Sequence, residues 1–336
     1  MFFVPFVEGH VSLGFHKIVL VGSSSDDSLA LRMIEGNFAE NYGITEDFIN
    51  QKVEIEFYEK AGYLDEINKW DIGRMSSERT DFPDLTDEEF ANHRMVTTTG
   101  MKKGVLYRTS SPINPMIKRS AIADAANKRA GVTTIINLSE SPESAASREG
   151  YADSYYATVN HIEVNMNTNF GEEDFNTRMA QGLRFMIEHP GVYEVNCIFG
   201  KDRTGFMIAV LECLAGATYD EVIDDYALTY SHYYPDYNNY TPIEERNVTI
   251  AEGNLIAQME YAYGVTNLKT KDLKQTTTDY LVNGAPEPDV KPDDKSGKDD
   301  SAKTANTLKV KGKVVSAGND KYLSGTKTAT VTIKVR

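Results

Sequence analysis

Short apolar runs and helical segments follow one another along the central part of the chain. Runs typical of buried strands occur at 105–107, 132–138, 161–165 and 192–195. Helices are expected between and after them, at about 118–130, 174–188 and 206–215. Because strands that alternate with helices pair in parallel, the pattern predicts an α/β fold with a mainly parallel sheet flanked by helices.

Two helix limits can be placed from the residues alone. The sequence His189-Pro190-Gly191 is expected to end the helix before it, since proline cannot continue a helix. Thr218 is followed three residues later by Glu221, which forms a capping box and predicts that another helix begins there.

The flanking parts of the chain have different patterns. Residues 1–95 read as a β-rich N-terminal unit with strands expected at 19–23, 29–34 and 53–57 and a helical turn at 38–43. Residues 285–303 are rich in proline and charge, which predicts a linker. Residues 304–336 alternate with period two near 308 and 328, which predicts a short β-module or a tail. The remaining domain, 96–284, contains the alternating strands and helices.

Composition narrows the class of protein. The 336 residues are 40% hydrophobic and 25% charged, as in ordinary globular proteins, and the net charge of -15 argues against a nucleic-acid surface. No apolar run approaches the roughly 20 residues that span a membrane. Residues 1–6 are too short, and lack the charged region, for a signal peptide. The sequence is therefore compatible with a cytosolic protein or, if a leader was removed, with a secreted or surface protein.

The chain has two cysteines, Cys197 and Cys213. If the intervening helix is intact, about four and a half turns separate them, which is too far for a disulfide. Cys213 is expected to pack in the core. The six histidines show no metal-ligand spacing, and neither a metal nor another cofactor is expected.

The segment 196–205 carries the chemistry. It contains a cysteine, five residues, an arginine and then a hydroxyl residue, between a strand-like run and an apolar helical run. A loop at a helix N-terminus directs unpaired N–H groups at one place and favours negative charge there. The loop residues expected to line this anion cradle are Ile198, Phe199, Gly200, Lys201 and Gly205.

Two side chains of the segment complete the predicted site. Arg203 offers a planar fork that can hold two phosphate oxygens. Cys197 would lie on the floor of the cradle, where the same field stabilises its thiolate. A thiolate beneath a bound phosphate is a nucleophile directed at phosphorus.

This segment resembles the His-Cys-x5-Arg-Ser/Thr loop of the cysteine-dependent protein tyrosine phosphatases. The sequence Gly-Lys-Asp-Arg-Thr-Gly at 200–205 is similar to the loop of the bacterial and fungal group that includes lipid- and triple-specificity enzymes. Segments 106–112 and 130–138 also resemble that group, and the likeness covers roughly residues 96–284. Two departures stand out: Asn196 replaces the histidine, and Asn137-Leu138-Ser139 replaces Asp-Leu-Arg.

The resemblance implies roles for individual residues. Thr204 would hydrogen-bond the thiolate as it leaves in the second step, although a helix cap would look the same. The chain has no Trp-Pro-Asp loop, which carries the acid in most tyrosine phosphatases. In the resembled group the loop Asp next to the Arg serves instead, so the resemblance implies that Asp202 is the general acid and base. Asp202 could instead only brace Lys201 or Arg203, and Asp174, Glu172 or Glu173 are then the rival acids.

For Lys201, Arg108 and the stretch 226–240, the sequence allows a role in the site and a purely structural role. In the resembled group a lysine at the place of Lys201 favours substrates with extra phosphates, but an exposed lysine is an equal alternative. Arg108 is assigned to the substrate site, where it would steady the entry loop, or it is ordinary structure. The tyrosine-rich stretch 226–240 is more often a packing face than an aromatic wall for a phenyl ring.

The sequence therefore predicts a phosphatase that works through a phosphocysteine, on phosphotyrosine proteins or related phosphomonoesters including phosphoinositides. The first alternative is an inositol polyphosphate phosphatase with the same loop. The second is an inactive surface module that binds phospho-ligands. The oligomeric state is not predicted.

Overall fold

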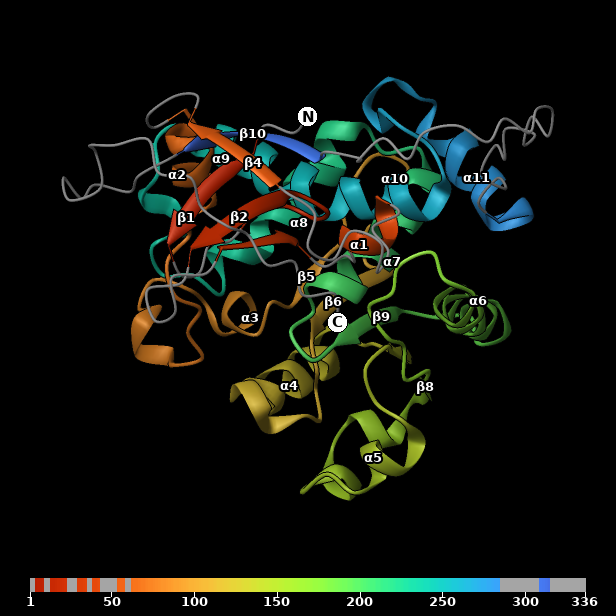
Figure 1. Cartoon of the computed structure of the whole chain (residues 1–336). Coiled ribbons are helices and arrows are strands. Elements are labelled where there is room, and N and C mark those ends of the chain that lie inside the picture. The colour runs from red at the N-terminus through yellow and green to blue at the C-terminus, as the bar shows by residue number, and fades with distance from the viewer. Residues whose placement is uncertain are drawn as a thin grey trace. The chain divides into compact units, whose positions relative to one another are not determined.

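The computed structural model describes residues 4–8, 13–22, 29–34, 38–42, 53–57, 62–284 and 308–314. The chain forms two compact units: residues 1–71 with 289–336, and residues 72–288 (Figure 1). The predicted linker, and the second predicted strand of the tail near 328, lie outside the described residues.

The first unit is built on one five-stranded sheet with the order β3-β2-β1-β10-β4. Its strands are β1 (Pro5–Glu8), β2 (Ile18–Gly22), β3 (Leu29–Met33), β4 (Val53–Phe57) and β10 (Leu308–Val314). Its helices are α1 (Phe38–Asn41) and α2 (Leu64–Trp70). The predicted N-terminal strands and the helical turn are thus confirmed, and Val4 and Leu20 form a buried cluster beneath them.

The pairing of β10 could not be predicted from the sequence. This strand from the C-terminal tail pairs in parallel with β1 on one side and with β4 on the other. The tail therefore completes the N-terminal sheet.

The second unit contains the expected, mostly parallel sheet, with the order β5-β6-β9-β7-β8. Its strands are β5 (Arg94–Met95), β6 (Leu106–Ser110), β7 (Thr134–Asn137), β8 (Asn160–Glu163) and β9 (Tyr193–Cys197). All neighbours are parallel except β5, the edge strand, which is antiparallel to β6. The predicted α/β class is confirmed.

Helices make up most of the rest of this unit. The α-helices are α3 (Asp87–Phe90), α4 (Ser120–Ala130), α5 (Pro142–Ala146), α6 (Glu173–Glu188), α7 (Asp202–Ala215), α8 (Tyr219–Ser231), α9 (Ile243–Ala251), α10 (Ala257–Tyr263) and α11 (Leu273–Asn283). A π-helical turn, Glu252–Ile256, joins α9 to α10. Short 3-10 turns lie at Arg79–Asp81, Pro115–Ile117, Tyr151–Asp153, Tyr156–Thr158, Tyr237–Asn239 and Leu268–Thr270. The capping box at Thr218 opens α8 as predicted.

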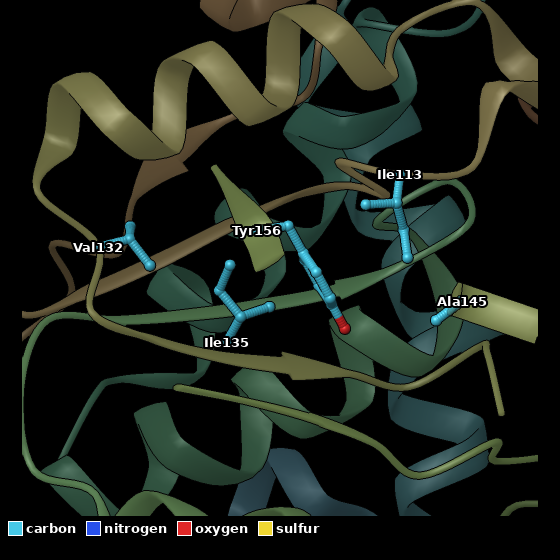
Figure 2. Packing of buried hydrophobic residues seen from close by; sticks show 5 residues of the cluster. All are labelled: Ile113, Val132, Ile135, Ala145 and Tyr156. Carbon is cyan, nitrogen blue, oxygen red and sulfur yellow. The ribbon is translucent and has the colours of Figure 1, made fainter. Parts of the chain in front are cut away.

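Side chains of β7 show that both faces of the sheet are covered. Ile135 packs with Tyr156, Ala145 and other buried residues on one face, where the Tyr156 ring lies in the middle of the cluster (Figure 2). The next residue, Ile136, points to the other face and approaches Gly182 of α6 so closely that an added Cβ would lie 3.0 Å from it. A strand buried on both sides requires the continuous apolar run seen in the sequence.

Strand β9 lies in the middle of the sheet, between β6 and β7. Its last residue, Cys197, pairs in register with Ser110, the last residue of β6. The chain leaves the sheet at this carboxyl edge, the edge at which open α/β sheets bind their ligands.

Candidate active site

The predicted nucleophile lies at the junction of strand and helix. Cys197 ends β9, its side chain is only 3% exposed, and it is a free thiol. Five residues later α7 begins at Asp202, and its first intrahelical bond runs from the Gly205 N–H to the Lys201 carbonyl. The N–H groups of residues 202–204 therefore have no partner within the helix, as an anion site requires.

The loop between them is held by its carbonyl groups. The Ile198 carbonyl accepts a hydrogen bond from the Ser111 N–H at 3.1 Å, and the Phe199 carbonyl accepts one from the Tyr233 hydroxyl at 2.6 Å. The Gly200 carbonyl accepts one from Arg108 Nη2 at 2.9 Å. In a trans peptide the N–H points opposite to the preceding carbonyl. The N–H groups of residues 199–201 consequently point away from these outer donors. That of Gly200 donates a hydrogen bond to the Cys197 carbonyl at 3.3 Å.

The two glycines of the loop are needed for packing. Gly200 has a φ of +64°, and an added Cβ would lie 2.2 Å from the Thr109 carbonyl oxygen of β6. An added Cβ at Gly205 would lie 2.6 Å from the Tyr226 ring of α8, so Gly205 allows α7 to pack closely against this helix. Because the Gly205 N–H is used inside α7, we correct its role from substrate contact to helix packing.

Arg203 is half-buried in the first turn of α7. Its Nη1 donates a hydrogen bond to the Met166 carbonyl at 2.8 Å, which holds one end of the guanidinium against the segment after β8. The same helical turn carries Thr204, whose side-chain hydroxyl is buried and has no hydrogen-bond partner. A buried hydroxyl without a partner is costly, and it is a donor available to a thiolate or a ligand.

Lys201 and Asp202 form an ion pair. Lys201 Nζ lies 2.6 Å from an Asp202 carboxylate oxygen and 5.1 Å from the centre of the Tyr230 ring, and its side chain is 16% exposed. Burial would lower the pKa of Lys201, but the Asp202 carboxylate together with the side chains of Tyr230 and Tyr234 outweighs burial and holds that pKa well above its ordinary value. The carboxylate that we considered as the general acid is therefore also the one that pairs with Lys201.

Arg108 lies behind the loop. It is fully buried, and besides Gly200 it contacts the carboxylate of Asp225 in α8. Burial would raise the pKa of Asp225, but the guanidinium groups of Arg94 and Arg108 outweigh it and lower that pKa to about 2. Arg108 thus holds the Cys197 loop, whereas the role weighed for it was to steady the entry loop, and its side chain is not exposed to a substrate.

Asn196, which replaces the family histidine, faces a second buried acid. Its side-chain amide donates to Glu194 at 3.0 Å, and both residues are fully buried. Burial raises the pKa of Glu194 well above its ordinary value despite the hydrogen bonds from Asn196 and Asn127, which favours the neutral carboxyl. Asn196 and Glu194 thus place a hydrogen-bonded pair close to Cys197 in sequence, and the neutral carboxyl adds no negative charge beside the thiolate.

The rival acids lie at the start of α6. Asp174 is exposed and accepts from Arg178 at 2.9 Å and from Asn167 at 3.0 Å, while Glu172 accepts from Asn169 at 3.1 Å. Met166, the partner of Arg203, lies in the segment that leads to these residues.

The tyrosine-rich stretch is a packing face, the alternative we favoured. Tyr226, Tyr230, Tyr233 and Tyr237 are each at most 2% exposed, and the Tyr230 and Tyr237 rings stack at 5.8 Å. Tyr233 is also one of the donors to the loop, a role that the sequence did not reveal.

Sequence reasoning missed other residues that hold the loop. Asn92 and Ser111 bond the loop directly. Arg94 and His232 contact Asn92, and Asp225 and Thr229 contact Arg108. No spacing rule links them, because they come from different elements and meet only in the fold.

Within the described part of the chain there is no cluster of three or more His, Cys, Asp or Glu that could hold a metal ion. Over the same residues, no helix is long and apolar enough to cross a bilayer.

A family model for the tyrosine phosphatase family matches residues 89–283, more than half of the chain. The chain belongs to this tyrosine phosphatase family. The match contains the Cys197 loop and every residue found to hold its carbonyls. The protein is therefore a phosphatase of the tyrosine phosphatase type.

Solved structures that match part of the chain include TpbA of P. aeruginosa, with 15% identity and a TM-score of 0.27 over 44% of this chain and 87% of that one. The catalytic domain of the PP-IP phosphatase SIW14 of S. cerevisiae has 15% identity and a TM-score of 0.30 over 51% and 91%. The Yvh1 phosphatase domain of Chaetomium thermophilum has 13% identity and a TM-score of 0.28 over 51% and 96%. No curated protein matches the chain.

Proposed function

We propose that this phosphatase hydrolyses phosphomonoesters through a phosphocysteine at Cys197. The observation that carries the proposal is the loop of residues 198–201. Its carbonyls are bound from outside, and the strand before it ends in a buried free thiol. Amides that point away from these donors, together with the open first turn of α7, form a cradle for a phosphoryl group above Cys197.

The reaction has two steps. The Cys197 thiolate attacks phosphorus, the bond from phosphorus to the ester oxygen breaks, and Asp202 donates a proton to the departing oxygen. Asp202 then accepts a proton from a water molecule, which attacks phosphorus. The bond from phosphorus to sulfur breaks, inorganic phosphate leaves, and Thr204 donates a hydrogen bond to the thiolate that re-forms.

Arg203 is the proposed clamp. Its Nη1 contact with Met166 fixes the guanidinium, and the Nε and Nη2 edge would hold two phosphoryl oxygens. A planar fork suits the flat arrangement of equatorial oxygens in the transition state, and a lysine cannot reproduce it.

We propose that Lys201 exchanges its ion pair with Asp202 for one with the substrate phosphate. In the free protein it is paired with Asp202. A dianionic phosphate that competes for the ammonium would release the Asp202 carboxyl to take up and donate its proton. Lys201 would thus couple the arrival of the substrate to the availability of the acid.

We propose phosphotyrosine proteins, or related phosphomonoesters including phosphoinositides, as substrates. An inositol polyphosphate needs several cations around a deep pocket. The segment 196–205 supplies two cations, Lys201 and Arg203. This small number favours a substrate of which a single phosphate group is bound.

Phosphate release from a tyrosine-phosphorylated peptide, a phosphoinositide and an inositol polyphosphate tests the proposal. Wild type and Cys197→Ser are compared on each substrate. We expect release from the first two and none from Cys197→Ser. Preferred turnover of the inositol polyphosphate would favour the first alternative, and binding without release by wild type would favour the inactive module.

A further inference from the structure

Asn92 lies far from the Cys197 loop in sequence but contacts its backbone twice. The residue is fully buried between α3 and β5. Its side-chain Nδ2 donates to the Phe199 carbonyl at 3.2 Å and to the Gly200 carbonyl at 3.1 Å. Two consecutive peptide groups of the loop therefore share one amide donor.

The orientation of this amide follows from its partners. Asn92 Oδ1 accepts a hydrogen bond from Arg94 Nη1 and lies 3.1 Å from His232 Nδ1. Arginine can only donate and the loop carbonyls can only accept, so the amide cannot be turned round. His232 must then carry its proton on Nδ1. Burial and the nearby guanidinium groups lower the pKa of His232 to about 3, so its imidazole is neutral at ordinary pH.

The backbone of Asn92 is suited to this position. Its φ is +56°, in the left-handed region that asparagine tolerates better than most residues, and its N–H bonds the Glu89 carbonyl at 2.8 Å as α3 ends. This left-handed residue reverses the chain between α3 and β5, at the point where its amide meets the loop.

The other donors to these carbonyls each hold one peptide. Tyr233 contacts the Phe199 carbonyl and Arg108 contacts the Gly200 carbonyl. Among the described residues, Asn92 alone bonds both carbonyls through its side chain. It therefore fixes the angle between two neighbouring peptide planes, which neither of the other donors can do.

We propose that Asn92 is a positioning residue that holds the peptide groups before Gly200 and Lys201, and thereby sets the direction of the Lys201 N–H and the affinity of the loop for phosphate. The inference rests on the proposed function of the loop. If the carbonyls turn inward, their negative ends face the phosphoryl oxygens, and the loop changes from an anion cradle to a surface that repels anions.

The test uses Asn92→Asp, which keeps the shape of the side chain but places an acceptor against two acceptors. The matched control is Asn267→Asp, since Asn267 also has a left-handed φ, of +55°, but lies at a turn outside the loop. The readouts are the inhibition constant of inorganic phosphate, kcat and KM for a nitrophenyl phosphate, and the melting temperature.

We expect Asn92→Asp to weaken phosphate inhibition at least about 10-fold and to lower kcat/KM about 100-fold, as for the loss of one oxyanion donor. The control should match wild type in both. A merely structural role would lower the active fraction and the melting temperature but leave the inhibition constant of the folded enzyme unchanged. An inhibition constant within about twofold of wild type would overturn the proposal.

Asn92→Gly keeps the test decisive if the aspartate variant does not fold. Glycine accepts the left-handed backbone and removes the amide without adding charge. It should also weaken phosphate inhibition, and an unchanged constant in this variant would overturn the proposal equally. Cys197→Ser separates the two hypotheses. Activity in that variant contradicts the phosphocysteine mechanism, whereas a normal Asn92 variant beside an inactive Cys197→Ser contradicts only the role of Asn92.

Discussion

Arg108 Nη2 donates a hydrogen bond to the Gly200 carbonyl at 2.9 Å across 92 residues of sequence. The same guanidinium contacts Asp225, so one buried ion pair joins β6 to α8 and holds the back of the Cys197 loop. The phosphate loop is thus a continuation of the core of this unit, and changes behind it are expected to reach the chemistry.

Arg108→Met should therefore reduce both stability and activity. It leaves the Asp225 carboxylate with fewer partners, and breaking a buried pair costs about 3–5 kcal/mol. Urea unfolding and nitrophenyl phosphate turnover measure the two effects. The control is Arg129→Met, which breaks the exposed contact with Glu88 and should cost under about 1 kcal/mol. Equal effects of the two variants would contradict a special role for Arg108.

Gly200→Ala should distort the loop. The added Cβ would lie 2.2 Å from the Thr109 carbonyl oxygen, and the φ of +64° is unfavourable for alanine. Gly104→Ala controls for the backbone term, because its φ is +76° but no described atom would lie within 4 Å of the added Cβ. We expect Gly104→Ala to cost about 1 kcal/mol and to keep full activity. Activity is expected to be lost only with Gly200→Ala.

The acid is tested by the dependence on the leaving group. Asp202→Asn should slow the hydrolysis of an alkyl phosphate by about 10²–10⁴-fold and that of a nitrophenyl phosphate far less. Asp174→Asn, which removes an exposed partner of Arg178, should have little effect on either substrate. If Asp174→Asn shows the leaving-group dependence instead, Asp202 is only the partner of Lys201.

Asp225 should make stability depend on acid pH. Its pKa of about 2 in the folded protein lies below the unfolded value of about 3.9. The ionised group therefore contributes its full stability above about pH 4 and loses it as the pH falls toward 2, a difference of about 2 kcal/mol. Unfolding free energies of wild type and Asp225→Asn across this range should differ in slope. The exposed Asp279→Asn serves as control. Parallel slopes for wild type and Asp225→Asn would contradict the buried pair.

The sequence could predict the strand before Cys197, the helix after it and the anion loop between them. The apolar periodicity and the glycines of this one segment determine these elements locally. The donors that orient the loop could not. Asn92, Arg108 and Tyr233 meet it across 34 to 108 residues of sequence. Nor could the place of β10, since parallel pairing of distant strands leaves no local pattern. Asn196 was recognised as a departure, but its buried partner Glu194 was not, because an acid in a strand looks exposed until the opposite face is covered.

Transfer of the phosphoryl group to Cys197 is the step on which the proposed mechanism depends. Rapid acid quenching of the protein during turnover of a phosphomonoester, followed by peptide mass spectrometry, tests it most directly. We expect a phosphoryl group on the peptide that carries Cys197 in wild type, a larger trapped fraction in Asp202→Asn with a nitrophenyl phosphate, and none in Cys197→Ser. Turnover without a phosphorylated Cys197 peptide, or a phosphoryl group on another residue, would contradict the account.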